Sequence, residues 1–322
     1  MYDAHDAVRF IAEHSTFLVL GHKEPDGDCI ASQLGVSALL GALGKKASLY
    51  SAGPFDRPEI QAWDSQFSSR IPDEKLAGSA VIIVDCSTLD RTGPLGERVT
   101  GLPCLVIDHH SSGEDFGTAR FVEPSAPSAT MLVLQLFEDM GVTLKQETAR
   151  LLLFGLCTDT GFFRHLAENT ADTFRAVARL VEAGTSTAEM YMMVYGGREL
   201  AGRKLLAEML QRVESHWGDR LLLTWQTMAD RARLSVAQRG EDDLYRLLQT
   251  IEGNVVVALV KEEAKGVFSV GLRSNSTQDV GAIAASFGGG GHRQAAGFDI
   301  TGTLETVKKK LIDTFSPLLS EM

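Results

Sequence analysis

Three short runs in the first half of the chain consist of apolar, mostly branched residues with no polar residue between them. They span residues 17–20, 80–84 and 104–107. Strands buried on both faces of a sheet show such continuous runs, whereas strands with one solvated face alternate between apolar and polar residues. Helical segments separate the runs, as in βαβ units. The pattern predicts an α/β fold with a parallel sheet and helices on both of its faces.

Longer segments place apolar residues at helical spacing. In the first half, helices are predicted at residues 1–15, 30–43, 128–140 and 146–156, with a further short strand at 47–50. The second half reads as strand, helix, helix, strand and strand, at residues 221–225, 228–234, 244–251, 255–262 and 266–272. A terminal helix is predicted to begin at Thr303.

The 322 residues exceed the length of one ordinary domain, so two domains are expected. Residues 187–216 have a helical pattern that Gly196, Gly197 and Gly202 interrupt. We therefore expect a first domain at 1–186, a helical linker at 187–216 and a smaller α/β domain at 217–322, with the active site in the cleft between the two domains.

Composition narrows the class of protein. The chain is 44% hydrophobic without a run of membrane-spanning length, and its charged first 15 residues do not resemble a secretory signal. The four cysteines are scattered and form no CxxC pair, which favours reduced thiols in a cytoplasm. A net charge of −11 argues against a broad basic surface for duplex DNA. It does not exclude a small anionic substrate, because bound cations would dominate the local field.

Side chains of the kind that bind metals follow each predicted parallel strand, and ligands bind at that edge of such sheets. The candidates are His22, Asp26, Asp28, Asp85, Asp108, His109, His110 and Asp159. Taken alone, the aspartates of the turn 25–28 fit an ordinary turn or capping position as well as they fit a metal site, and Asp159 fits a turn better. Because ligand-type residues occur at several strand ends at once, the set as a whole favours a metal site.

This donor set mixes imidazole and carboxylate without thiolate, which favours Mn²⁺ or a similar ion over structural zinc. Several aspartates suit two ions that share a bridging carboxylate. Two ions about 3.5–4 Å apart can lower the pKa of a shared water and stabilise an in-line phosphoryl displacement.

The run of glycines at 288–291 precedes His292 and has two interpretations. One is a mobile loop. The other is a backbone nest whose N–H groups approach an anion, with Arg273, His292 and Arg293 supplying positive charge nearby.

The ordered motifs HKEPDGD, VDCS, DHH and CTDTG resemble those of the DHH phosphoesterase superfamily. The segments RSN and GGGGHRQAAG are similar to its DHHA1 substrate-binding domain. Together the motifs span nearly the whole chain. Within the superfamily, the size and the domain set resemble the NrnA-type nanoRNases, which degrade very short oligoribonucleotides and dephosphorylate pAp.

The resemblance implies six ligands for two Mn²⁺ ions, with Mg²⁺ or Co²⁺ as alternatives: His22 and Asp26 on one ion, Asp28, His109 and Asp159 on the other, and Asp85 on both. His110 would contact the scissile phosphate and assist the leaving group, so that Asp85 and His110 are the expected catalytic residues. Asp108 would orient its neighbours.

The same resemblance assigns substrate binding to the second domain, where Arg273, Ser274, Gly290, Gly291 and His292 would hold a terminal phosphate or nucleotide. The expected substrates are short single-stranded RNA, dinucleotides and pAp, with nucleoside monophosphates as products. A phosphodiesterase for pApA or c-di-AMP is the close alternative. A pyrophosphatase fits less well because of the second domain, and a non-catalytic nucleotide-binding protein would be expected to have lost a ligand. A homodimer is left open.

Overall fold

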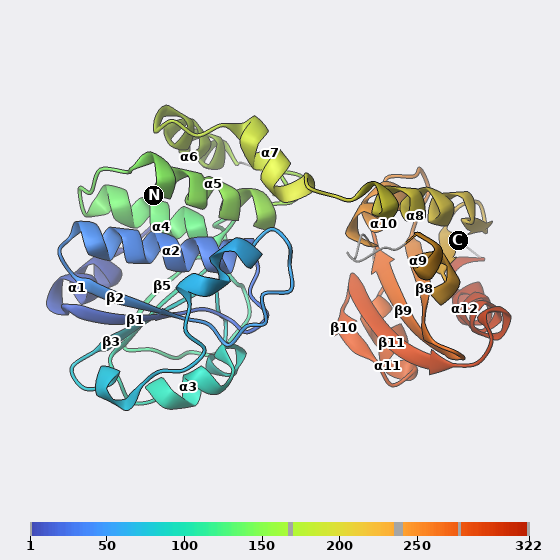
Figure 1. The fold of residues 1–322 in the computed structure, drawn as a ribbon, viewed down its shortest axis with the longest axis horizontal. Helices are drawn as coiled ribbons and strands as arrows, with labels where there is room; N and C mark the ends of the chain where they lie inside the picture. The colour runs from blue at the N-terminus through green and yellow to red at the C-terminus, as the bar shows by residue number, and fades with distance from the viewer. Residues whose placement is uncertain (1, 167–169, 235–240, 276–277, 321–322) are drawn as a thin grey trace. The chain divides into compact units, whose positions relative to one another are not determined.

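The computed structural model describes residues 2–166, 170–234, 241–275 and 278–320. It divides into two compact units, Met1–Gly197 and Arg198–Met322 (Figure 1). The division falls between helix α7, Thr187–Tyr195, and helix α8, Leu200–Gln211. Gly196 and Gly197 therefore separate two helices as predicted, whereas the expected interruption at Gly202 is wrong. Gly202 lies inside α8, and a side chain there would meet open space.

The first unit is built on a five-stranded sheet in the order β2-β1-β3-β4-β5, and all of its neighbouring strands are parallel. The strands are β1 Thr16–Leu20, β2 Lys46–Tyr50, β3 Ala80–Val84, β4 Cys104–Asp108 and β5 Ala119–Val122. This confirms the predicted parallel sheet. The sequence did not indicate β5, because it lies at the sheet edge and only Phe121 of its residues is fully buried.

Helices cover both faces of this sheet, as predicted (Figure 1). Side chains alternate along β1, so that Phe17 and Val19 join the larger apolar cluster and Leu18 and Leu20 join the smaller one. The larger cluster contains residues of six helices: α1 His5–Glu13, α2 Gly27–Ala42, α4 Ala129–Asp139, α5 Gln146–Asp159, α6 Ala171–Glu182 and α7. The smaller cluster lies under α3, Pro94–Val99.

The second unit contains a six-stranded sheet in the order β10-β11-β9-β8-β7-β6. Only β7 and β8 pair in parallel, and the other neighbours are antiparallel. The strands are β6 Glu214–His216, β7 Leu221–Gln226, β8 Val256–Ala264, β9 Val267–Ser274, β10 Gly290–His292 and β11 Ala295–Thr301. This smaller α/β unit agrees with the predicted fold class.

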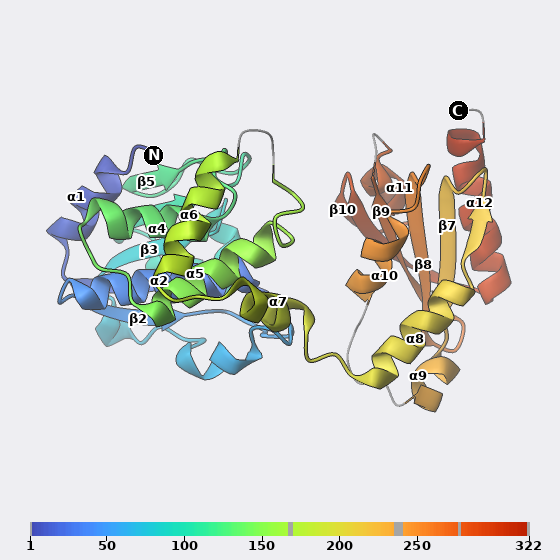
Figure 2. The ribbon, with the colours of Figure 1, turned by 90° about the horizontal axis from the view of Figure 1, so that it is seen from above.

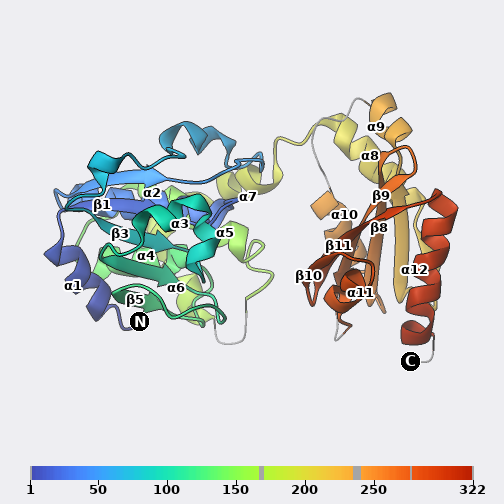
Figure 3. The same ribbon diagram turned by 90° about the horizontal axis from the view of Figure 1, so that it is seen from below.

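Helices also cover both faces of the second sheet. Residues of α8 and of α10, Glu241–Leu248, pack on one face (Figure 2). Those of α11, Val280–Ser286, and α12, Leu304–Leu319, pack on the other (Figure 3). Helix α9 is Met228–Leu234. Thr303 caps α12 by accepting a hydrogen bond from the N–H of Thr306, as the sequence suggested.

The glycine-rich run is partly a strand. Gly290, Gly291 and His292 form β10, which pairs with β11 at the edge of the sheet. Of the two interpretations of the glycine run, the mobile loop therefore does not hold for Gly290 and Gly291. Among the described residues, no helix combines the length and the apolar character needed to cross a membrane.

Candidate metal centre and second-unit pocket

The turn between β1 and α2 places three of the predicted ligands. His22 follows the strand, and Asp26 caps the helix by accepting a hydrogen bond from the N–H of Cys29 at 3.1 Å. Asp28 lies in the first helical turn. Gly27 allows this turn to lie close to α5, because a Cβ there would be 2.4 Å from Oγ1 of Thr158.

Asp28 is fully buried and is anchored to the N-terminus of α4. Its Oδ2 accepts a hydrogen bond from the N–H of Ala129 at 2.7 Å. Its Oδ1 accepts from the N–H of Thr130 at 3.1 Å and from the hydroxyl of Thr130 at 2.7 Å. Burial, with the charges of Asp85 and Asp159, raises the pKa of Asp28 well above its usual range. A nearby cation would relieve this unfavourable environment.

Asp85 follows β3 and lies between two imidazole rings. Its Oδ2 is 3.4 Å from Nε2 of His22, and its Oδ1 is 3.5 Å from Nε2 of His109. The backbone of Asp85 has φ = 51°, a left-handed conformation that aspartate tolerates better than most residues. Such conformations occur where the surrounding structure enforces them, often at functional sites. The two carboxylate oxygens thus face two different clusters of ligand atoms.

His22 belongs to the first of these clusters. Its Nδ1 is 2.8 Å from the carbonyl oxygen of Lys23, so Nδ1–H donates there and Nε2 is the ring nitrogen that faces the carboxylates. Nε2 lies 3.8 Å from Oδ1 of Asp26 as well as near Asp85. Burial favours the neutral ring, but Cys29 and the two carboxylates more than offset it and raise the pKa of His22.

His109 connects Asp85 to the second cluster. Its Nε2 is 3.6 Å from Oδ2 of Asp159 and 4.0 Å from Oδ2 of Asp28. Burial favours the neutral ring, but the hydrogen bond to Asp85 and the charges of Asp28 and Asp159 raise the pKa of His109 to about 10. Burial raises the pKa of Asp159 to about 6.

Asp108 and His110 form a hydrogen-bonded pair beside Asp85. The Nδ1–H of His110 donates to Oδ1 of Asp108 at 2.7 Å, and the backbone N–H of His109 donates to the same oxygen at 2.9 Å. Burial opposes the charge on Asp108, but these donors hold the pKa of Asp108 below its usual value. The pairing leaves Nε2 of His110 available for a substrate.

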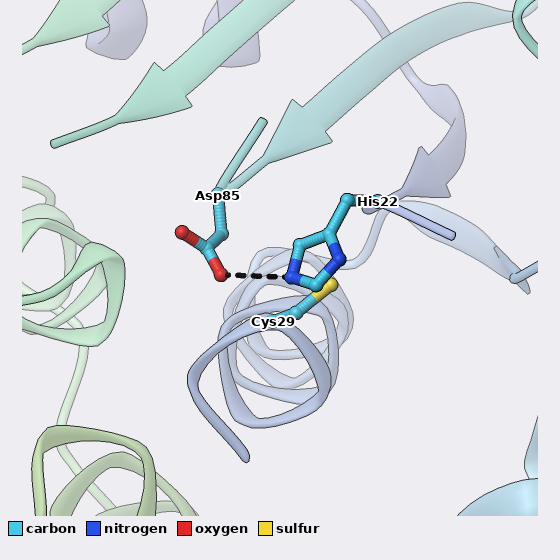
Figure 4. Close-up of side chains that lie close together, drawn as sticks. All are labelled: His22, Cys29 and Asp85. Atoms are coloured by element: carbon cyan, nitrogen blue, oxygen red, sulfur yellow. Dashed lines mark ion pairs between the residues drawn. The ribbon is translucent and has the colours of Figure 1, made fainter. Parts of the chain in front are cut away.

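The structure therefore brings together all of the side chains that the sequence singled out in the first domain. Ligand atoms lie within 4.8 Å of one another in three groups: His22, Cys29 and Asp85; Asp85, His109 and His110; Asp28, His109 and Asp159. Cys29 is an unexpected member, and Figure 4 shows its sulfur beside the His22 ring. Imidazole and carboxylate donors at these separations fit divalent ions. The raised pKa values of Asp28 and Asp159 show that a bound cation would stabilise the charged form of these buried carboxylates.

The predicted substrate residues of the second unit are only partly brought together. A cavity of about 670 Å³ is lined by Arg273, Gly290 and Gly291. Ser274 is buried and is the neighbour of Arg273 on β9, so its side chain points to the opposite face of the sheet. His292 is exposed on β10 and does not line the cavity. Tyr245 and Lys261, which the sequence did not single out, line it as well.

Comparison with known proteins identifies the class to which this fold and this cluster belong. Residues 16–156 match the model of the DHH family, N-terminal domain, and residues 229–321 match that of the DHHA1 domain. The chain belongs to the DHH family of metal-dependent phosphoesterases. It is 32% identical to the bifunctional oligoribonuclease and PAP phosphatase NrnA of Thermus thermophilus, over 95% of each chain.

Two further proteins are similar to the chain over most of its length. The cyclic-di-AMP phosphodiesterase GdpP of Geobacillus thermodenitrificans is 26% identical over 90% of this chain and 45% of its own length. The crystal structure of an exopolyphosphatase-related protein from Bacteroides fragilis superposes with a TM-score of 0.85 at 22% identity, covering 99% of this chain and 98% of the other. This structural likeness supports the fold alone.

Proposed function

We propose that the protein is a phosphodiesterase with two Mn²⁺ ions that hydrolyses short oligoribonucleotides to nucleoside monophosphates and pAp to AMP. The observation that carries the proposal is the position of Asp85, whose two oxygens face His22 and His109 at 3.4 and 3.5 Å. A carboxylate placed in this way suits a bridge between two ions. The relative from Thermus thermophilus supports the choice of substrates, since it carries both activities in its name.

The proposed ligand roles are those that the resemblance to the DHH family implies, and the distances within the two clusters support them. His22 and Asp26 would hold one ion, Asp28, His109 and Asp159 the other, and Asp85 both. When bound, such a pair of ions lowers the pKa of a shared water and stabilises charge on the phosphoryl oxygens. Mg²⁺ or Co²⁺ fits the same donors. The four free cysteines suit a reducing cytoplasm, where we expect the protein to act.

His110 would act on the leaving group. Asp108 fixes its ring through Nδ1, which leaves Nε2 as the atom that can hold a proton for the departing oxygen. Asp108 thus positions His110 without contacting the substrate.

The second unit would bind the part of the substrate that is remote from the scissile bond. Arg273 can hold a phosphate through two parallel N–H bonds, and the glycines at 290 and 291 let the backbone approach an anion closely. Contacts of Ser274 and His292 with the substrate remain predictions, since neither side chain lines the cavity beside Arg273. Binding energy from this remote group can also help to orient the bond that is cut.

One assay tests the proposal. The protein is incubated with Mn²⁺ and, in separate reactions, with pAp, a ribodinucleotide, pApA or pyrophosphate. We expect hydrolysis of pAp and the dinucleotide to exceed that of pyrophosphate by orders of magnitude. Activity on pyrophosphate alone, or on none of these compounds, would contradict the proposal.

The second candidate is a phosphodiesterase for pApA or c-di-AMP. The similarity to the cyclic-di-AMP phosphodiesterase GdpP over 90% of this chain favours it. The chain covers less than half of that relative, however, whereas it covers 95% of the oligoribonuclease from Thermus thermophilus. A clear preference for pApA over other ribodinucleotides in the same assay would select this candidate.

A further inference from the structure

Arg273 lies on the face of an aromatic ring. Its guanidinium carbon is 4.5 Å from the centroid of the Tyr245 ring. Tyr245 belongs to α10 and is only 5% exposed, within an apolar cluster that includes Leu244 and Leu248 of the same helix. A guanidinium stacked on an aromatic face at this distance is attracted by the ring and is restricted in its rotamers.

The backbone of β9 makes room for this ring. Gly271 lies two residues before Arg273, so both face the side of the sheet that α8 and α10 cover. A Cβ at Gly271 would lie 2.1 Å from the Tyr245 hydroxyl oxygen. Any residue with a side chain at position 271 would therefore displace the ring from its place under Arg273.

The charge of Arg273 is not neutralised by an acidic side chain of the described residues. Its Nη1 donates to the carbonyl oxygen of Leu272 at 3.0 Å, and no carboxylate within the described ranges forms an ion pair with it. Lys261, which lines the same cavity, differs, because its Nζ is 2.9 Å from Glu241 and 3.7 Å from Glu263. Of these two cations, Arg273 is the one that keeps its capacity for an anionic ligand in the cavity.

We propose that Tyr245 is a positioning residue, which holds the Arg273 guanidinium in place to receive a phosphate group of the substrate. This inference rests on the proposed role of Arg273 in substrate binding. A long arginine side chain loses rotamer freedom when it binds a ligand, and a ring that fixes it beforehand reduces that loss. Tyr245 would act on affinity through Arg273 and would not touch the substrate.

The test compares two substrates in Tyr245 variants of the full chain. Tyr245→Leu removes the ring, and we expect KM for pAp and a ribodinucleotide to rise about two- to thirtyfold, the range of a cation–π contact. The rate with bis-p-nitrophenyl phosphate, which offers nothing to the second unit, should stay the same. Tyr245→Phe keeps the ring and should restore KM to near the wild-type value.

Two controls separate positioning from a loss of folding. Leu248→Ala shortens another buried side chain of α10 and should lower the stability of the second unit without raising KM. In an Arg273→Ala background, Tyr245→Leu should have no further effect on KM, because the group it positions is gone.

The outcomes are distinct. If Arg273→Ala raises KM and Tyr245→Leu does not, the inference is wrong and the proposed function stands. If Tyr245→Leu raises KM to the same extent with and without Arg273, the ring acts by another route and the inference is again wrong. If Arg273→Ala itself leaves KM unchanged, both the inference and the proposed role of Arg273 are overturned.

Discussion

At the scale of single residues, the account depends on Asp85. The motif resemblance implied that Asp85 serves both ions, but its left-handed backbone and its distances to His22 and His109 could not be read from the sequence. Strand-end positions were enough to predict that His22, Asp85 and the segment 108–110 converge, whereas Asp28 and Asp159 lie at helix ends and were placed in the site by the motif resemblance. The stacking of Tyr245 on Arg273 depends on packing between a helix and a strand that are separate in the sequence, which no local pattern encodes.

The first prediction concerns Asp85→Asn. Asparagine tolerates the left-handed conformation, so the variant tests charge with little added backbone strain. We expect it to weaken the binding of both ions and to reduce phosphodiesterase activity by about a hundredfold or more, since a bridging charge serves both positions. Asp159→Asn should weaken the binding of only one of the two ions. Metal content after dialysis and titration calorimetry measure the difference, and equal, mild losses in the two variants would count against a shared centre.

At the scale of elements, the continuous apolar runs were sufficient to predict β1, β3 and β4, because buried parallel strands have little polar sequence. Strands β5, β6, β10 and β11 were not predicted, and β6 corrects the expectation that residues 187–216 are helical throughout. The sequence of β5 is only four residues long, Ala-Arg-Phe-Val, with a charged residue inside it, and that of β10 is Gly-Gly-His, which has low strand propensity and is held by pairing with β11. In β5 and β10, pairing with the neighbouring strand overrides the secondary-structure preference of the local sequence.

The second prediction tests the close packing of α5 against α4 and α2, which holds Asp28 in place. A Cβ at Gly155 would lie 2.5 Å from Cγ2 of Thr130 and 3.1 Å from Oδ1 of Asp28. Gly155→Ala should therefore destabilise the first unit by about 1–3 kcal/mol, as overpacked cores do. Denaturant unfolding of the metal-free protein measures the change.

Gly41→Ala is the matched control. Gly41 lies in the exposed last turn of α2, where a Cβ would meet nothing within 4 Å. Alanine should stabilise the helix there by about 0.5–1 kcal/mol, because it has the higher helix propensity. If Gly155→Ala were also neutral or stabilising, the proposed tight packing around Asp28 would be wrong.

At the scale of the whole molecule, the chain consists of two units with separate apolar cores. The sequence predicted two domains from length and from the glycines near position 196, and the structure changes from one unit to the other at Gly197. The proposed division into 1–186, 187–216 and 217–322 remains a prediction, because the compact units do not set a linker apart.

The third prediction follows from this separation. The proposed ligands all lie in the first unit, so Mn²⁺ should stabilise that unit alone. Mass action gives about 2.7 kcal/mol at a hundred times the dissociation constant. In calorimetry, we expect Mn²⁺ to raise the midpoint of one unfolding transition and EDTA to reverse it, with the second transition unchanged. Unfolding of residues 198–322 expressed alone identifies the transition of the second unit. If Mn²⁺ shifted only that transition, the assignment of the ligands to the first unit would be wrong.

The most direct test of the account is anomalous diffraction at the manganese edge from crystals grown with Mn²⁺. We predict two peaks about 3.5–4 Å apart, one on each side of the Asp85 carboxylate. One peak should contact His22 and Asp26, and the other should contact Asp28, His109 and Asp159. A single peak at full occupancy, or two peaks that do not share Asp85, would contradict the two-ion centre on which the proposed function rests.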